Sequence, residues 1–253
     1  MLKAITRGIS PCIGDCELTY LERQEIDAEK AMQQQKSYEQ YLSSLGLSVT
    51  SLPAEPTLPD AVFVEDTAVV VDEVAVITTM GAISRRPEVH SISPALAEYR
   101  PLEFINSTGT LEGGDVMRVN RTLYVGVSTR TNLDGIAQLR SILRPYDYLV
   151  TAVGVKHCLH FKTGCTYLGR NMILVNREWV DLSPFEGFEV IDVPVWEPWA
   201  ANVLVVGNDL LVPASCPRTG ELLQARGFNV HTINVSELEK AEAGLTCMSI
   251  IFN

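Results

Sequence analysis

Short apolar stretches interrupted by turn-forming residues recur along the chain. In four places, two runs rich in β-branched and apolar side chains flank Asp, Asn or Gly residues. This pattern is typical of a β-hairpin. The four predicted hairpins span residues 68–77, 115–125, 167–175 and 203–212. The apolar tail, residues 243–252, predicts a buried final strand.

Three other segments predict helices. Residues 20–45 have a helix-forming composition and are followed by Gly46, and residues 218–226 are likewise followed by Gly227. Glycine is common just past the end of a helix. Residues 131–143 form the third predicted helix. Helices placed between hairpins indicate a mixed α/β protein.

A polar or reactive side chain precedes each hairpin and appears once more in the tail. These residues recur at intervals of 42 to 48 positions: Glu65, Glu112, His160, Asn202 and Cys247. Such a period indicates structural repetition, as in a solenoid or a propeller. The last unit lacks a second strand, which residues 2–6 can supply by closing a ring. Equivalent positions of a closed ring converge on its axis, so these side chains are predicted to share one pocket.

Composition and charge narrow the classes of partner. The 253 residues are 46% hydrophobic and 20% charged, which suits one large globular domain or two small ones. The net charge of -11 argues against nucleic acid and is compatible with a cationic small molecule. No run is long and apolar enough for a membrane span and no leader opens the chain, so we expect a cytoplasmic protein with no membrane partner. A homodimer is left open.

The cysteines do not form the pattern of a disulfide framework. Cys12 and Cys16 are close enough to begin a zinc site, but no second close pair completes it. The sequence assigns no role to Cys158, Cys165 or Cys216. Cys247 in its apolar tail is by default a small packing residue. As a nucleophile it would need a positive charge nearby to favour the thiolate.

A histidine and a carboxylate share the repeat position of Cys247. His160 is the best candidate of the four histidines for acid–base chemistry, although a lone histidine is more often structural. Glu112 precedes two glycines, which suit either close approach to a ligand or a plain hairpin entry. A cysteine, a histidine and a carboxylate in one pocket form the set that covalent catalysis needs.

Charged residues in other segments suggest recognition of an amino acid. Asp60, Glu65 and Asp66 are embedded in apolar sequence, where carboxylates are costly without a positive partner. That partner is either a cationic ligand or a structural arginine. Arg85 and Arg130 can bind a carboxylate through two parallel hydrogen bonds, although each alone would be read as a surface residue.

Seven ordered motifs resemble the dimethylarginine dimethylaminohydrolases. They are PDAVFVED (59–66), SRR (84–86), LEGGD (111–115), STRTN (128–132), LHFKT (159–163), AAN (200–202) and LTCMS (245–249). The resemblance extends from Leu18 to the tail. It implies the pentein fold, a five-bladed α/β propeller of ββαβ repeats with pseudo-five-fold symmetry, and a single catalytic domain over residues 1–253.

The resemblance also implies a reaction. Cys247 would attack the guanidinium carbon of an Nω-methylated arginine, and His160 would protonate the departing amine and then activate water. Glu112 would hold the guanidinium and His160 in place. The products would be citrulline and a methylamine. No cofactor or metal has a step to perform, although zinc trapped by Cys247 and His160 would inhibit.

The remaining implied roles concern the binding of a small cationic amino acid. Asp66 and Glu65 would bind its guanidinium group, and Asp60 would bind its ammonium group. Arg85 and Arg130 would bind its carboxylate. Leu18 would form a lid, and the backbone of Ala241 would complete the contacts.

Other readings compete with this one. Arginine deiminases carry an aspartate where this chain has Lys162, so its absence favours a methylated guanidinium. Enzymes of the agmatine type have no substrate carboxylate to bind and would leave Arg85 and Arg130 unused. A related amidine hydrolase remains an alternative, as does a non-catalytic binding protein that retains the pocket.

Overall fold

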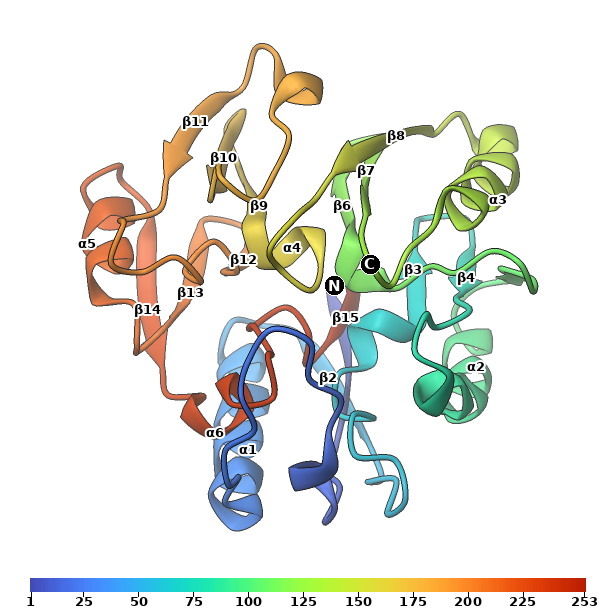
Figure 1. Cartoon of the computed structure of the whole chain (residues 1–253), viewed down its shortest axis with the longest axis horizontal. Coiled ribbons are helices and arrows are strands. Elements are labelled where there is room, and N and C mark those ends of the chain that lie inside the picture. The colour runs from blue at the N-terminus through green and yellow to red at the C-terminus, as the bar shows by residue number, and fades with distance from the viewer.

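Five three-stranded sheets make up the framework of the computed structural model, which describes all residues, 1–253. Figure 1 shows the sheets arranged around the middle of the molecule with the longer helices outside them. Both chain ends lie near the centre of this view. The structure is therefore a mixed α/β fold, as predicted.

Each sheet combines one antiparallel pair with one parallel pair. In strand order the sheets are β3 (Ala68–Val70), β4 (Ala75–Ile77) and β5 (Leu102–Phe104); β6 (Val116–Val119), β7 (Thr122–Val127) and β8 (Leu149–Gly154); β9 (Cys165–Gly169), β10 (Met172–Val175) and β11 (Glu189–Asp192); β12 (Leu204–Val206), β13 (Asp209–Pro213) and β14 (Asn229–Ile233); and β15 (Ile250–Phe252), β1 (Lys3–Arg7) and β2 (Ser48–Leu52). The first two strands of each set are antiparallel and the last two are parallel.

The parallel pairs are joined by crossovers, most of which contain a helix. The α-helices are α1 (Ala28–Ser44), α2 (Val89–Ala97), α3 (Leu133–Leu143), α4 (Phe161–Gly164), α5 (Pro217–Gln224) and α6 (Ser236–Glu239). Only a single 3-10 turn, Ser183–Phe185, lies between β10 and β11. Two further 3-10 turns, Val64–Thr67 and Gly113–Asp115, directly precede β3 and β6.

All four predicted hairpins are confirmed. The pairs β3–β4, β6–β7, β9–β10 and β12–β13 are antiparallel and connected by short turns at the expected positions. Asn120 and Gly207 adopt positive φ values of 55° and 62° in two of these turns. Asparagine and glycine tolerate this conformation better than other residues, which is why turn chemistry marked the hairpins in the sequence.

The helix predictions are corrected at two points. The first helix begins at Ala28 rather than near residue 20, because the side chain of Asp27 accepts a hydrogen bond from the Lys30 backbone and caps it there. The preceding residues form a loop. Helix α2 was not predicted; it contains Pro94, a residue that is unfavourable inside a helix. Helices α3 and α5 lie where the sequence predicted them.

The tail differs from the predicted strand over residues 243–252. Strand β15 contains only Ile250–Phe252, and residues 245–248 form a turn. Cys247 therefore lies on a turn in front of the strand. The pairing of β15 with β1, in which Ala4 faces Ile251, confirms that the N-terminal run completes the last unit.

Packing between the sheets divides the core into several clusters. The largest contains 19 buried residues, among them Phe63, Tyr38 and Met248, and packs under α1 and the tail turn. Leu18 and Cys247 lie against the same cluster. None of the helices combines the length and apolar character that crossing a membrane requires.

Candidate active site

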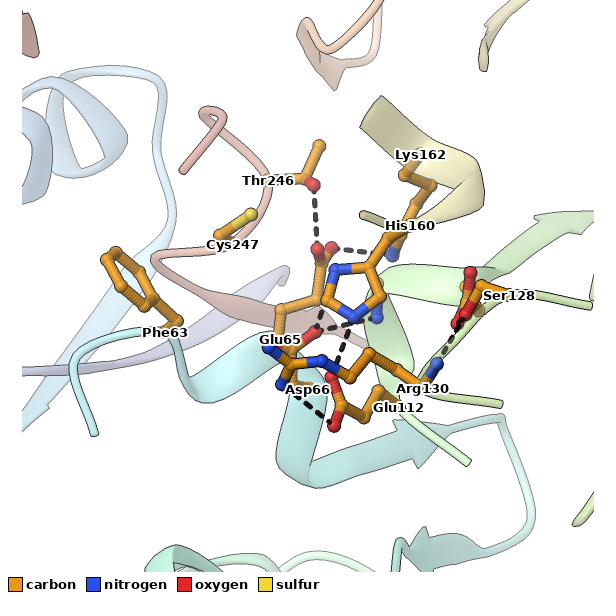
Figure 2. Close-up of polar contacts among 12 residues, drawn as sticks. Phe63, Glu65, Asp66, Glu112, Ser128, Arg130, His160, Lys162, Thr246 and Cys247 are labelled. Carbon is orange, nitrogen blue, oxygen red and sulfur yellow. Dashed lines mark hydrogen bonds and ion pairs between the residues drawn. The ribbon is translucent and has the colours of Figure 1, made fainter. Parts of the chain in front are cut away.

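The repeat residues converge on the centre of the molecule because each lies just before the first strand of its sheet. Glu65 and Asp66 lie in the 3-10 turn before β3, Glu112 precedes the 3-10 turn before β6, and His160 precedes α4 and β9. Cys247 lies in the turn before β15. Figure 2 shows these side chains facing one another across a small volume.

His160 and Glu112 form the closest pair in this group. His160 Nε2 lies 2.7 Å from Glu112 Oε2, and both side chains are buried. The other ring nitrogen, Nδ1, lies 3.8 Å from Asp66 Oδ1. Burial alone would lower the pKa of His160, but the carboxylates of Asp66, Asp115 and Glu112 raise it to about 9. His160 is therefore an imidazolium at neutral pH.

The same charges keep the neighbouring carboxylates ionised. Burial opposes ionisation of Glu112, yet the hydrogen bond and charge of His160 hold the pKa of Glu112 below its usual value. For Asp66, the charges of His160 and Arg85 likewise overcome burial and lower the pKa. Backbone N–H groups of Gly81 and Gly114 donate to Glu112 and Asp66 at 3.0 Å each. The site thus holds fixed negative charge beside a protonated imidazole.

Arg85 is bound within this cluster by the protein itself. Its Nη1 donates to Asp66 Oδ2 at 2.8 Å, while Nε and Nη2 donate to the two oxygens of Glu88 at 2.9 Å. Only 3% of Arg85 is exposed, and these donors all face carboxylates of the protein. The positive partner of Asp66 is the structural arginine that the sequence left as one of two alternatives.

Glu65 is also satisfied internally. Its two oxygens accept hydrogen bonds from Lys162 Nζ at 2.6 Å and Thr246 Oγ1 at 2.7 Å (Figure 2). Burial raises the pKa of Glu65, and Lys162 opposes that rise. Lys162, which stands where arginine deiminases carry an aspartate, provides the counter-charge of Glu65.

Cys247 is held at the edge of the carboxylate cluster. Its Sγ accepts a hydrogen bond from the Gly244 backbone at 3.4 Å, and its carbonyl accepts one from the Glu65 backbone at 3.2 Å. The side chain is half-buried. Burial first, and then the negative charges of Glu65 and Asp66, raise the pKa of the Cys247 thiol well above its usual range. The thiol is therefore protonated at neutral pH when no ligand is bound.

Arg130 differs from Arg85 in having a free donor. Its Nη1 is buried without a hydrogen-bond partner and lies 3.6 Å from Glu112 Oε1. Its backbone N–H donates to Ser128 Oγ, which in turn donates to Asp115. A buried guanidinium nitrogen without an acceptor is costly, and a bound anion would satisfy it.

Asp60 connects the site to the loop that carries Leu18. Both Asp60 oxygens accept from the Glu17 backbone, at 3.3 and 3.1 Å, and burial raises the pKa of this carboxyl. The loop is anchored a second time by Glu242, whose Oε1 accepts hydrogen bonds from the backbone of residues 19, 20 and 21. Ala241, which precedes this anchor, is buried. Asp60 and Ala241, both predicted as site residues, thus lie next to the two anchor points of the loop that carries Leu18.

Asn202 was placed on the repeat by the sequence but given no role. Its side-chain amide donates to the Lys162 carbonyl and Thr246 Oγ1, and its Oδ1 accepts from the Thr246 backbone. A Cβ on Gly244 would lie 2.3 Å from Asn202, so only glycine permits this approach. Asn202 thus ties the turn of Cys247 to the segment that follows His160.

The same region contains one possible set of metal ligands. Donor atoms of Asp66, Glu112 and His160 lie within 4.8 Å of one another. Arg85 Nη1 is 2.8 Å from Asp66 and 4.0 Å from Glu112, so a guanidinium already supplies positive charge to these carboxylates. The six cysteines, including Cys12 and Cys16, are free thiols.

Comparison with known proteins gives consistent matches. The sequence model described as "N,N dimethylarginine dimethylhydrolase, eukaryotic" matches residues 18–192. The chain is 36% identical over 228 residues to an N(G),N(G)-dimethylarginine dimethylaminohydrolase of Pseudomonas aeruginosa, covering 89% of this chain and 90% of that protein. It is 36% identical over 251 residues to the protein of the same name from Streptomyces coelicolor, covering 98% and 96% of the two chains.

One solved structure also matches this chain over its whole length. It is the dimethylarginine dimethylaminohydrolase of Pseudomonas aeruginosa, in a cysteine-to-serine mutant complexed with citrulline. The two structures superpose with a TM-score of 0.94 at 34% identity, and the match covers 100% of each chain.

Proposed function

The chain belongs to the dimethylarginine dimethylaminohydrolase family, and we propose that it hydrolyses Nω-methylated L-arginine to L-citrulline and a methylamine. The observation that carries this proposal is the buried Glu112–His160–Asp66 cluster beside the thiol of Cys247. The cluster offers fixed carboxylates to a guanidinium, a proton donor to a leaving amine and a nucleophile to the central carbon.

The substrate guanidinium binds to the carboxylates first. A guanidinium is a poor electrophile because its charge is delocalised, and Asp66 and Glu112 localise that charge by binding its N–H groups. Asp66 exchanges Arg85 for the substrate in this step. Glu88 retains Arg85 through Nε and Nη2, so Nη1 is the donor that becomes free.

Binding of the cation activates Cys247. The negative charges of Glu65 and Asp66 raise the pKa of the thiol, and a positive guanidinium placed among them has the opposite effect. The thiol loses its proton to solvent, and the thiolate sulfur forms a bond to the guanidinium carbon. The resulting tetrahedral adduct holds the sulfur, the side-chain nitrogen and the two terminal nitrogens.

His160 then transfers the protons. Its Nε2 is hydrogen-bonded to Glu112, so Nδ1, which lies 3.8 Å from Asp66, is the nitrogen available to the substrate. The Nδ1 proton passes to the methylated nitrogen, the carbon–nitrogen bond breaks and the methylamine departs, leaving a thiouronium on Cys247. Neutral His160 takes a proton from water as the water oxygen attacks the same carbon. The carbon–sulfur bond then breaks as the hydroxyl proton of this adduct passes to solvent, which releases citrulline and the thiolate.

The amino-acid end of the substrate lies toward the loop of Leu18. Asp60 binds its ammonium group, and Arg130, with its unpartnered Nη1, binds its carboxylate. Arg85 contributes to the carboxylate through the Nη1 that the substrate displaces from Asp66. Leu18 covers the bound substrate, and the backbone of Ala241 completes the contacts.

The arrangement of the fold supports these roles. We propose that the five sheets form a five-bladed propeller with pseudo-five-fold symmetry, as in penteins, and that residues 1–253 constitute one catalytic domain. Each sheet repeats the same order of one antiparallel and one parallel pair, and helices lie in four of the five crossovers. The repeat residues therefore meet at the axis because they occupy equivalent positions in the five repeats.

A substrate panel tests the proposed activity. Dimethylarginine, monomethylarginine, arginine and agmatine are each offered to the protein, and release of citrulline or amine is measured. We expect turnover of the two methylated arginines. Turnover of arginine or agmatine without turnover of dimethylarginine would contradict the substrate and favour a different amidine hydrolase. Absence of turnover with all four, with dimethylarginine bound, would favour a binding protein.

A further inference from the structure

A cavity with its own set of side chains lies next to the turn of Cys247. It has a volume of about 310 Å³, and its wall includes Asn202 and Gly244. Gly244 donates its backbone N–H to Cys247 Sγ, so one short turn carries both the nucleophile and part of the cavity wall. Leu21 of the Leu18 loop also borders it.

Two tryptophans line this cavity and remain accessible. Trp196 is 79% exposed and Trp199 is 39% exposed. Trp199 is fixed by an edge-on contact with Trp179, with ring centroids 4.6 Å apart. Indole faces attract cations more strongly than other aromatic side chains do. Two accessible indoles on one cavity wall therefore offer aromatic surface to a cationic ligand.

Carboxylates line the same cavity, and none of them is in an ion pair. Glu239 accepts a hydrogen bond from Ser215, whereas the neighbouring Lys240 is directed to Glu237. Glu242 uses Oε1 to anchor the Leu18 loop, and its Oε2 is buried without a hydrogen-bond partner. Glu197 is satisfied by backbone and side-chain donors at the start of α5. Glu239 and Glu242 therefore place negative charge at the cavity without a cationic side chain to balance it.

We propose that this cavity binds a small organic cation with an N-methylated nitrogen. Carboxylates without counter-ions supply the charge, indoles accommodate the methyl groups, and no lysine, arginine or histidine lines the wall to repel such a ligand. The ligand would be the methylammonium product or a second molecule of methylated substrate, which share this chemistry. Only this choice of cation rests on the proposed function.

Ligand-observed NMR titration of the Cys247→Ser variant with dimethylammonium chloride tests the site without turnover. We expect saturable binding that is stronger than for ammonium chloride at equal ionic strength. Trp196→Ala and Glu239→Gln should each weaken it at least about fivefold, as loss of one cation–aromatic or charge contact predicts. Glu186→Gln, which removes an exposed carboxylate elsewhere, serves as the matched control. Because Trp196 is largely exposed, its replacement should not prevent folding, and circular dichroism checks this.

The two sources of the cation are separated by further titrations of the same variant. Dimethylammonium binding that persists with citrulline saturating the active site identifies the product as ligand. A second equivalent of bound dimethylarginine, lost in Trp196→Ala, identifies the substrate. The proposal is overturned if neither cation binds in a way that depends on Trp196 and Glu239. An enzyme that fails to hydrolyse dimethylarginine would contradict the proposed function without changing these binding results.

Discussion

The catalytic cluster and the Leu18 loop are held by different kinds of contact. In the cluster, buried charged side chains bind one another. His160 binds Glu112 and Lys162 binds Glu65 between different units of the fold, and Arg85 binds Asp66 within one unit. The loop is held by its backbone N–H groups, which donate to the carboxylates of Asp60 and Glu242. Breaking a buried ion pair is energetically costly, so such pairs hold a site in one geometry. Hydrogen bonds from exposed backbone groups break and form again more easily. We infer that the cluster determines the rate of chemistry and the loop determines substrate retention.

Removal of the nucleophile should have the largest effect on kcat and should leave substrate binding in place. We expect Cys247→Ser to lower kcat by about four orders of magnitude, because a hydroxyl is a far weaker nucleophile than a thiolate at neutral pH. Binding of dimethylarginine, measured by calorimetry, should remain. A rate close to that of the parent protein would show that another group is the nucleophile.

The charge of Glu112 should have the next largest effect. Glu112→Gln keeps the shape of the side chain but removes the anion that stabilises protonated His160. We expect kcat to fall by about two to three orders of magnitude, with KM changed far less, as for loss of a general acid–base partner. Steady-state kinetics with Glu103→Gln, an exposed carboxylate on β5, provides the matched control. Equal loss in both variants would mean that general charge, rather than the contact with His160, is responsible.

The sequence predicted the parts of the site that depend on local pattern. Turn residues such as Asn120 marked the hairpins, and the repeat spacing brought Glu112, His160 and Cys247 together. The pairing of Arg85 with Asp66 was not predictable in the same way, because it depends on how a side chain is oriented after the segments have packed. The apolar tail also could not distinguish a strand from a buried turn, since both bury apolar side chains.

The protonation of His160 should make stability depend on pH. Its pKa is raised to about 9 in the folded protein from an unfolded value of about 6.5. The folded state therefore holds a proton that the unfolded state releases between these values, so the stabilising contribution is complete below pH 6.5 and is lost as pH rises toward 9. We expect the free energy of unfolding to fall by about 2 kcal/mol between pH 7 and pH 9.

Chemical denaturation of the parent protein and of His160→Gln measures this contribution. The variant has no titrating group at this position and should show a flatter profile over the same interval. Glu88 and Asp115, whose pKa values burial raises to about 7 and about 6, act at lower pH and do not produce the same change. Parallel profiles for the two proteins would assign the dependence to another group.

Loss of the Glu242 anchor of the loop should have the smallest effect, and this effect should be on KM. Glu242→Ala removes the acceptor of three backbone N–H groups, so we expect KM for dimethylarginine to rise about tenfold with little change in kcat. Glu242→Gln keeps an oxygen acceptor but not the charge, and should recover about half of this loss in free energy, because charge-assisted hydrogen bonds are about twice as strong as neutral ones. A fall in kcat as large as that of Glu112→Gln would mean that the loop also orders the catalytic cluster. The rate and the affinity would then have a common structural origin rather than two.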